Sequence, residues 1–208
     1  MTKKIQSDTI ALDDSENRYQ LEEKKMIQQQ SISAVIRERI SIKSNYLPLE
    51  VKEEDIVTLL NDAVWAPNHG LREPWRFLFV SGERKEAFIQ TVLACYEAKA
   101  HEKVRSKLAD VPAFLVAIMP EDPRQKIWEE DFAAISTLIQ NLQLLGWEKE
   151  LGMVWKTPNH MYDPKFRRAI GVQNGEKIVG ILQLGYFDPA LHVKDRKRTN
   201  ALEKLSSF

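Results

Sequence analysis

The pattern of apolar and polar positions along the chain predicts helices interleaved with a few buried strands. Residues 113–119 and 177–184 are almost continuously apolar, which is typical of strands buried on both faces. Residues 76–80 form a third predicted strand, and 152–156 a short strand or extended loop. Apolar positions at helical spacing predict helices over residues 33–39, 49–65, 84–107, 124–150 and 163–170. Helices interleaved with a few buried strands indicate an α+β or an α/β fold. Of the two we expect the α+β fold, with a mixed central β-sheet flanked by helices.

The helix predicted over residues 124–150 is long, and its apolar positions are not confined to one stripe. They form two faces, with Phe132, Ile135, Ile139 and Leu142 on one and Ala134, Leu138 and Leu145 on the other. A helix that is apolar most of the way round must be covered most of the way round. Since one small domain has limited material to cover it, a homodimer interface is the economical explanation. The alternative is a central helix wrapped by its own domain.

Composition and charge narrow the class of protein. The chain has 208 residues, in which 30 lysines and arginines are balanced by 30 aspartates and glutamates. A net charge of zero argues against a protein that coats nucleic acid, and no apolar run approaches the length of a membrane span. The single cysteine, Cys95, excludes an internal disulfide and a multi-thiolate metal site. We expect a cytoplasmic protein with neither a nucleic-acid nor a membrane partner.

The first 28 residues differ from the rest of the chain. They are polar, rich in Gln, Glu and Lys, and lack an apolar period. We therefore expect a flexible N-terminal extension over residues 1–28, followed by one domain over residues 29–208.

Three polar side chains near the start of the predicted domain indicate an anion site. Arg39, Ser41 and Lys43 alternate with apolar residues, so an extended backbone places them on one side. Two cations and a hydroxyl at this spacing suit a phosphate dianion, although basic clusters are more often solvated surface. The basic run at residues 194–198 has the same two interpretations.

A loop that contains two prolines and Gly70 directly precedes the strand predicted over residues 76–80. Loops at strand ends often bind ligands, and Trp65, His69 and Trp75 could stack on a planar ring. The alternative is that Trp75 belongs to the core and His69 is an exposed polar residue. The sequence gives little support to a metal site, because the four histidines are dispersed. It also contains no P-loop, nucleophile-elbow or dinucleotide-binding motif.

The order of these segments resembles the nitroreductase family of FMN enzymes. RISIK is followed by APNHGLREPWRF, by a long apolar helix ending EKELGMVWKT, and by IVGILQLGYFDP with a basic tail. The resemblance covers roughly residues 32–203. It implies that the flavin phosphate is held by Arg39, Ser41, Lys43 and a late basic residue, Arg196 or Arg198. It also implies that the partner subunit brings Trp65, Pro67 and His69 to the flavin ring, whose N5 atom lies near Trp155, Lys156 and Thr157.

The same resemblance implies an activity. It suggests a homodimer with two FMN sites, each built from both chains, that passes hydride from NAD(P)H through the flavin to nitroaromatic, quinone or similar small-molecule acceptors in a ping-pong reaction. The flavin carries the chemistry, so no catalytic side chain is expected. Two alternatives remain open. One is another flavin enzyme on the same fold, such as a dehalogenase, an oxidase or a flavin-fragmenting enzyme, and the other is a non-catalytic flavin-binding dimer.

Overall fold

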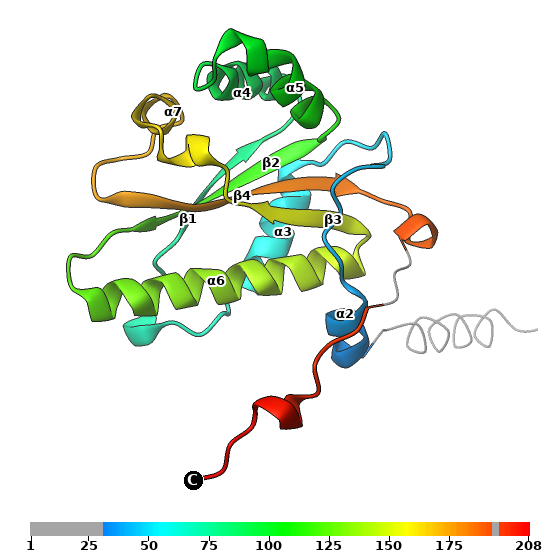
Figure 1. The fold of residues 1–208 in the computed structure, drawn as a ribbon, viewed down its shortest axis with the longest axis vertical. Coiled ribbons are helices and arrows are strands. Elements are labelled where there is room, and N and C mark those ends of the chain that lie inside the picture. The colour runs from blue at the N-terminus through cyan, green and yellow to red at the C-terminus, as the bar shows by residue number, and fades with distance from the viewer. Residues whose placement is uncertain (1–30, 193–195) are drawn as a thin grey trace, which may run out of the picture. The chain divides into compact units, whose positions relative to one another are not determined.

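The computed structural model describes residues 31–192 and 196–208 (Figure 1). The chain divides into two compact units, residues 1–38 and 39–208. In the first unit, helix α2 (Ile32–Glu38) begins after Ser31, whose hydroxyl accepts a hydrogen bond from the Ala34 N–H at 3.2 Å. The extension predicted over residues 1–28 lies outside the described residues. All the elements that follow belong to the second unit.

A four-stranded sheet forms the centre of the second unit. Its strands are β1 (Arg76–Val80), β2 (Ala113–Pro120), β3 (Leu151–Lys156) and β4 (Glu176–Tyr186), in the order β1-β2-β4-β3. The predicted α+β class is confirmed. The expectation of a mixed sheet is wrong, because every neighbouring pair of these strands is antiparallel.

The connections explain why no parallel pair forms in this sheet. β2 and β3 do run parallel to each other, as strands joined by a single helix usually do, but β4 lies between them. β1 and β2 are instead joined by two helices in succession, which return the chain to the end of the sheet that it left. Val80 at the end of β1 therefore pairs with Phe114 at the start of β2.

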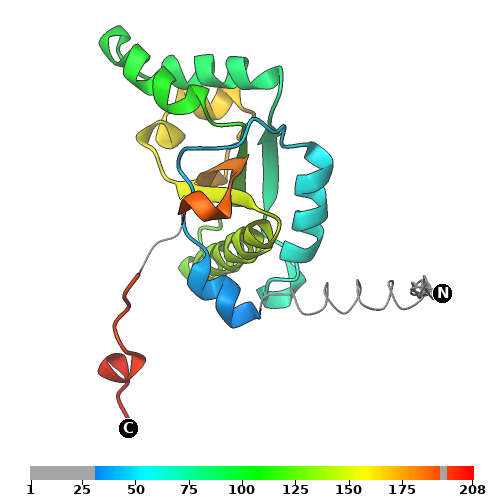
Figure 2. The same ribbon diagram turned by 90° about the vertical axis from the view of Figure 1, so that its right-hand side faces the viewer.

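Helices cover both faces of the sheet (Figures 1 and 2). One face carries α3 (Glu53–Ala63) and α6 (Gln125–Glu148), and the other carries α4 (Arg84–Leu93), α5 (Ala98–Ala109) and α7 (Pro164–Ala169). Because side chains alternate along a strand, β2 contributes to both cores. Leu115 packs with the α3 and α6 side chains, whereas Phe114 packs with those of α4 and α7. Residues 113–119 are buried throughout, as predicted for a strand covered on both faces.

Helix α6 is covered largely by its own chain. The buried positions Ala134, Ile135, Leu138, Ile139 and Leu142 pack against the sheet and α3. Polar side chains such as Lys126 and Gln140 line the exposed side of the helix. The buried apolar positions therefore do not need a second subunit, and the interpretation as a central helix within its own domain accounts for them. The homodimer stays a prediction, but the apolarity of α6 no longer supports it.

The single helix predicted over residues 84–107 is wrong, because two helices occupy this region. α4 ends at Leu93 and α5 begins at Ala98. The apolar stripe of the first helix stops at Tyr96, whose hydroxyl turns toward His160. A second stripe then starts with Val104 and Leu108, which are only partly buried. Charged residues on both sides of the break hid this change of direction in the sequence.

Candidate functional site

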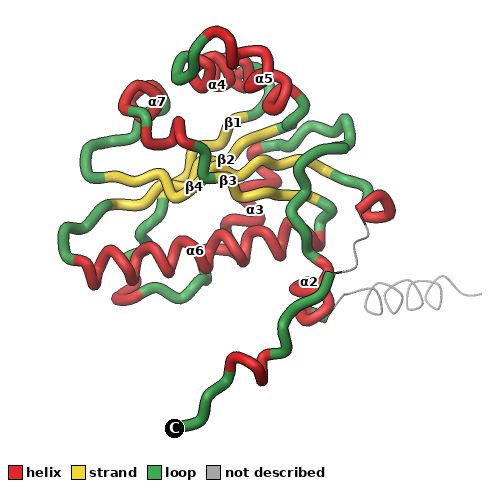
Figure 3. The backbone as a smooth tube through the Cα atoms, in the orientation of Figure 1, coloured by secondary structure: helices red, strands yellow, loops and turns green. Residues whose placement is uncertain are grey.

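Residues 39–43 alternate between the protein interior and its surface, as predicted. Ile40 and Ile42 are buried in a small cluster with Phe187. Ser41 and Lys43 are exposed between them. The segment belongs to a stretch of loop that runs to the start of α3 (Figure 3). The alternation therefore brings polar side chains to one side of an extended backbone that is anchored on the other.

Strand β3 holds this segment in place. The Ile42 N–H donates to the Met153 carbonyl at 3.3 Å. Gly152 lets the two backbones approach, since a Cβ there would lie 2.5 Å from the Ile42 Cγ1 atom. The Tyr46 hydroxyl donates to the Ile42 carbonyl at 3.0 Å, and burial raises the pKa of Tyr46 to about 12. The phenol therefore stays neutral, and it braces the loop.

Three guanidinium groups gather where this segment begins. Burial lowers the pKa of Arg39 from its ordinary value, and the nearby charges of Arg196 and Arg198 lower it further. The Nη1 atom of Arg39 is buried and donates to no group in the described part of the chain. A buried donor without an acceptor is unfavourable, and so are like charges held together. Both costs are relieved by an anion with several acceptor oxygens, so the cluster fits a phosphate.

A cleft of about 940 Å³ lies beside the loop, between α5 and the sheet. It brings together four residues that the resemblance placed at one site: Lys43, Trp155, Lys156 and Thr157. Helix α5 adds Lys103 and Lys107, and the apolar floor is lined by Phe88, Val92, Phe114, Leu108 and Ile181. Sequence reasoning missed the two α5 lysines, because nothing in a charged helix indicates which of its faces borders a cleft.

Trp155 is fixed by its contacts with β4. Its indole N–H donates to the Val179 carbonyl at 3.3 Å, and its ring occupies the space above Gly180, where any Cβ would overlap it. The ring packs with the core on the α6 side. Lys156, the next residue, therefore faces the opposite side of the sheet, where α5 borders the cleft. Trp155 and Lys156 are neighbours on β3, so this strand contributes one side chain to the core and the next to the cleft.

A hydrogen-bonded pair, Tyr96 and His160, also lines the cleft. The Tyr96 hydroxyl lies 3.0 Å from the His160 Nδ1 atom. His160 is only 8 % exposed, and burial lowers its pKa to about 4, with a smaller opposing effect from Asp163. The imidazole is therefore uncharged at neutral pH. The two residues are 64 positions apart, and no sequence signal joins them.

The loop predicted to approach a planar ring does not border this cleft in the same chain. Trp65 is 86 % exposed, and Pro67 and His69 are also exposed. None of the three lines the cleft. The structure thus divides the predicted residues into a group at the cleft and the arginine cluster, and an outward-facing group beyond α3.

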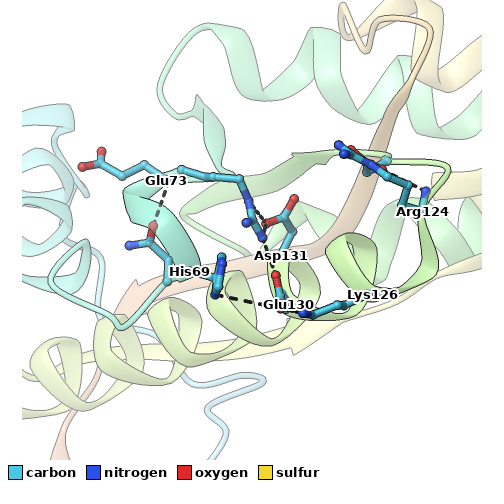
Figure 4. A network of polar contacts seen from close by, with 9 residues as sticks. His69, Glu73, Arg124, Lys126, Glu130 and Asp131 are labelled. Carbon is cyan, nitrogen blue, oxygen red and sulfur yellow. Dashed lines mark hydrogen bonds and ion pairs between the residues drawn. The ribbon is translucent and has the colours of Figure 1, made fainter.

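Ion pairs fix the outward-facing loop to α6 (Figure 4). The Arg72 guanidinium binds the buried Asp131 carboxylate at 2.7 and 3.0 Å and Glu130 at 3.0 Å. The Asn68 side-chain oxygen accepts the Glu73 N–H at 3.0 Å. Leu71 and Glu73 have φ values of 53° and 45°, in the left-handed region that costs energy for residues with side chains. These contacts hold the loop in a strained conformation that exposes its aromatic end.

The guanidinium groups of Arg39, Arg196 and Arg198 thus gather near an amphipathic cleft, on an antiparallel sheet that lies between two helical layers. The chain belongs to the nitroreductase family, whose sequence model matches residues 36–186. In the described residues, no helix is long and apolar enough to cross a membrane, and no cluster of side chains could hold a metal ion.

Three relatives extend this result. YfhC of Bacillus subtilis, which carries the name of an NAD(P)H nitroreductase, is 41 % identical over 170 residues, or 78 % of this chain and 87 % of YfhC. A nitroreductase-like protein from Bacillus cereus is 39 % identical with a TM-score of 0.81, over 87 % of this chain and 97 % of that one. A Desulfovibrio desulfuricans nitroreductase in complex with FMN is 17 % identical, with a TM-score of 0.67 over 87 % of this chain and 98 % of its own, which shows the shared fold.

Proposed function

We propose that this protein is an FMN-dependent oxidoreductase that transfers hydride from NAD(P)H to nitroaromatic, quinone or similar acceptors in a ping-pong reaction. One observation carries the proposal. Arg39 presents a buried donor that no residue in the described part of the chain satisfies, near Arg196 and Arg198, and the adjacent loop leads into the cleft through Lys43. The FMN complex of a protein with the same fold supports this choice of cofactor, and the name of YfhC supports NAD(P)H as the reductant.

The residues of the site take distinct roles. Arg39, Ser41 and Lys43 hold the phosphate together with Arg196 or Arg198, because charged donors on several sides match its oxygens. The backbone of residues 155–157 runs along the ring, held in register by the Trp155 contacts with β4. Bound FMN supplies the hydride chemistry. Lys156 at the cleft adds positive charge that favours negative charge developing on a bound ring.

The active form is a homodimer in this proposal. Trp65, Pro67 and His69 lie outside the cleft of their own chain and are exposed. The Arg72 ion pairs nevertheless hold their loop in a strained, defined conformation. We infer that the loop completes the cleft of a second copy, which gives two equivalent sites per dimer. This symmetry is the usual arrangement of self-associating proteins.

The visible absorption spectrum of the purified protein tests the proposal. We expect a yellow protein whose flavin bands bleach when NADH or NADPH is added without oxygen and return when a quinone is added. A bound flavin that neither nucleotide bleaches would instead identify a non-catalytic flavin protein. A colourless protein that does not take up added FMN would overturn the cofactor assignment itself.

A further inference from the structure

The cleft carries a charge that the whole chain lacks. The formal net charge of the protein is zero. Yet the residues that line the cleft include four lysines, Lys43, Lys103, Lys107 and Lys156, against one acidic residue, Asp110. None of the four forms an ion pair with any residue in the described ranges. The lining of the cleft therefore carries an excess of positive charge, with Asp110 as its one acidic residue.

The floor of the same cleft is mostly apolar and carries no charged side chain at neutral pH. Phe88, Val92, Phe114 and Ile181 are buried core residues that also border the cavity. The polar pair on this floor, Tyr96 and His160, adds no charge at neutral pH, since the pKa of His160 is about 4. A ligand that matches this distribution has a flat apolar body and an anionic group that stays at the rim.

Two of the lysines are placed to select such a ligand. Lys103 and Lys107 are one helical turn apart on α5 and therefore share a face. Both border the cleft, whereas Lys99, one turn earlier, does not and forms an ion pair with Glu97 at 2.6 Å. The flavin phosphate has its own proposed partners in the Arg39 cluster. The α5 lysines are thus available to a second anion.

We propose that the cleft selects aromatic acceptors that carry an anionic group, such as a carboxylate, and that Lys103 and Lys107 determine this specificity. The inference rests on the proposed function in treating the bound aromatic anion as the electron acceptor. It assigns the apolar floor to the ring and the α5 lysines to the anion. Exposed lysines exchange some water for the anion, so the preference weakens with salt.

Calorimetric titration of the purified protein with benzoate and with benzamide tests the binding step directly. The two probes have the same ring and nearly the same shape but differ in charge. We expect benzoate to bind about tenfold more tightly at about 50 mM salt, with most of the difference lost at about 500 mM salt. Equal affinities at low salt, or tighter binding of benzamide, would overturn the proposal.

Single glutamine variants identify the lysines responsible. Lys103→Gln and Lys107→Gln should each lower the benzoate-to-benzamide affinity ratio about two- to fivefold. Lys99→Gln is the matched control, because it removes the same charge from the same helix outside the cleft. An equal decrease in all three variants would show a general surface field and overturn the assignment to the two lysines. So would a ratio unchanged in both cleft variants.

Two further measurements separate this inference from the proposed function. FMN affinity is measured in each variant by flavin fluorescence. A loss of FMN affinity with an unchanged benzoate ratio would assign the lysines to the flavin and overturn the proposal. Turnover of 4-nitrobenzoate and 4-nitrobenzamide should show the same preference in KM. If charge-selective binding is present but NAD(P)H reduces neither the protein nor these acceptors, the proposed function fails while the binding site stands.

Discussion

Two arginines in this protein, Arg72 and Arg39, have opposite charged surroundings. Arg72 binds a buried carboxylate, Asp131, and a second carboxylate, Glu130 (Figure 4). Arg39 has a buried Nη1 atom without an acceptor among the described residues, and the nearby charges of Arg196 and Arg198 lower its pKa. The first arrangement is complete in itself and stabilises a loop. The second leaves a buried donor that no described residue satisfies, which is why we place the proposed anion there.

The largest expected effect comes from a matched pair of substitutions in protein freed of flavin. Arg72→Met leaves the buried Asp131 carboxylate without its partner, so we expect a marked decrease in the urea midpoint. Arg39→Met removes the Nη1 donor, which has no acceptor in the ranges that the structure describes, and reduces repulsion with Arg196 and Arg198. Its midpoint should stay equal or rise. Urea unfolding followed by circular dichroism compares the two, and a larger loss in Arg39→Met would contradict the contrast between the two sites.

The next effect is the loss of folding stability at acidic pH that we expect from His160. The pKa of His160 is about 4 in the folded protein, below the ordinary value of 6.5, so the unfolded chain binds a proton first as the pH falls. The stabilising contribution is therefore complete above pH 6.5 and is lost as the pH falls from 6.5 to about 4. At about 1.4 kcal/mol per pH unit, the loss is roughly 3 kcal/mol.

The test is to measure the unfolding free energy across this pH range in the wild type and in His160→Gln. The other titrating groups are the same in the two proteins, so the difference between their pH dependences reports His160. The variant is expected to be less stable at pH 7, since its side chain loses the contacts with Phe166 and Tyr96. Its stability should nevertheless change less between pH 6.5 and 4. Parallel curves for the two proteins would show that His160 is not neutral in the fold.

A smaller effect is expected for flavin binding. Hydrogen bonds to charged groups contribute roughly 1.5–3 kcal/mol each, so Arg39→Ala should weaken FMN binding about 10- to 150-fold. Riboflavin lacks the phosphate, and its affinity should change little. Fluorescence titration with both ligands distinguishes a phosphate contact from damage to the fold, which would weaken both equally. A small effect on the affinities for both FMN and riboflavin would show that Arg39 is a surface charge that does not bind the phosphate.

The sequence predicted the site in part, and the limits have physical causes. Alternation around Ile40 and Ile42 is a local property, so the polar side of residues 39–43 could be predicted from the pattern. The buried strand over residues 113–119 could be predicted in the same way, from its continuous apolar run. The Tyr96–His160 pair and the α5 lysines depend on where a helix settles against the sheet, which no local period encodes. The order β1-β2-β4-β3 was hidden for the same reason, since the position of β4 is decided by pairing between distant segments.

The burial of α6 shows a different limit. Apolar positions around a helix indicate that it is covered but not by which chain, and here Leu138 is fully buried within one chain. A charge at Leu138 would therefore unfold the domain instead of testing a dimer. Exposed residues on the strained loop offer a better test, because their removal leaves the core of their own chain intact.

The smallest predicted effect tests the dimer through Trp65. The side chain is 86 % exposed, so Trp65→Ser should hardly change the stability of the fold. If the loop completes the site of a second copy, the substitution removes an aromatic contact with the ring, and both FMN and riboflavin should bind about two- to tenfold more weakly. Mixed dimers of Arg39→Ala and Trp65→Ser chains sharpen the test. One of their two sites combines the intact Arg39 of one chain with the intact Trp65 of the other, so it should bind FMN as the wild type does. Mixed dimers in which neither site recovers this affinity would show that each chain builds its site alone.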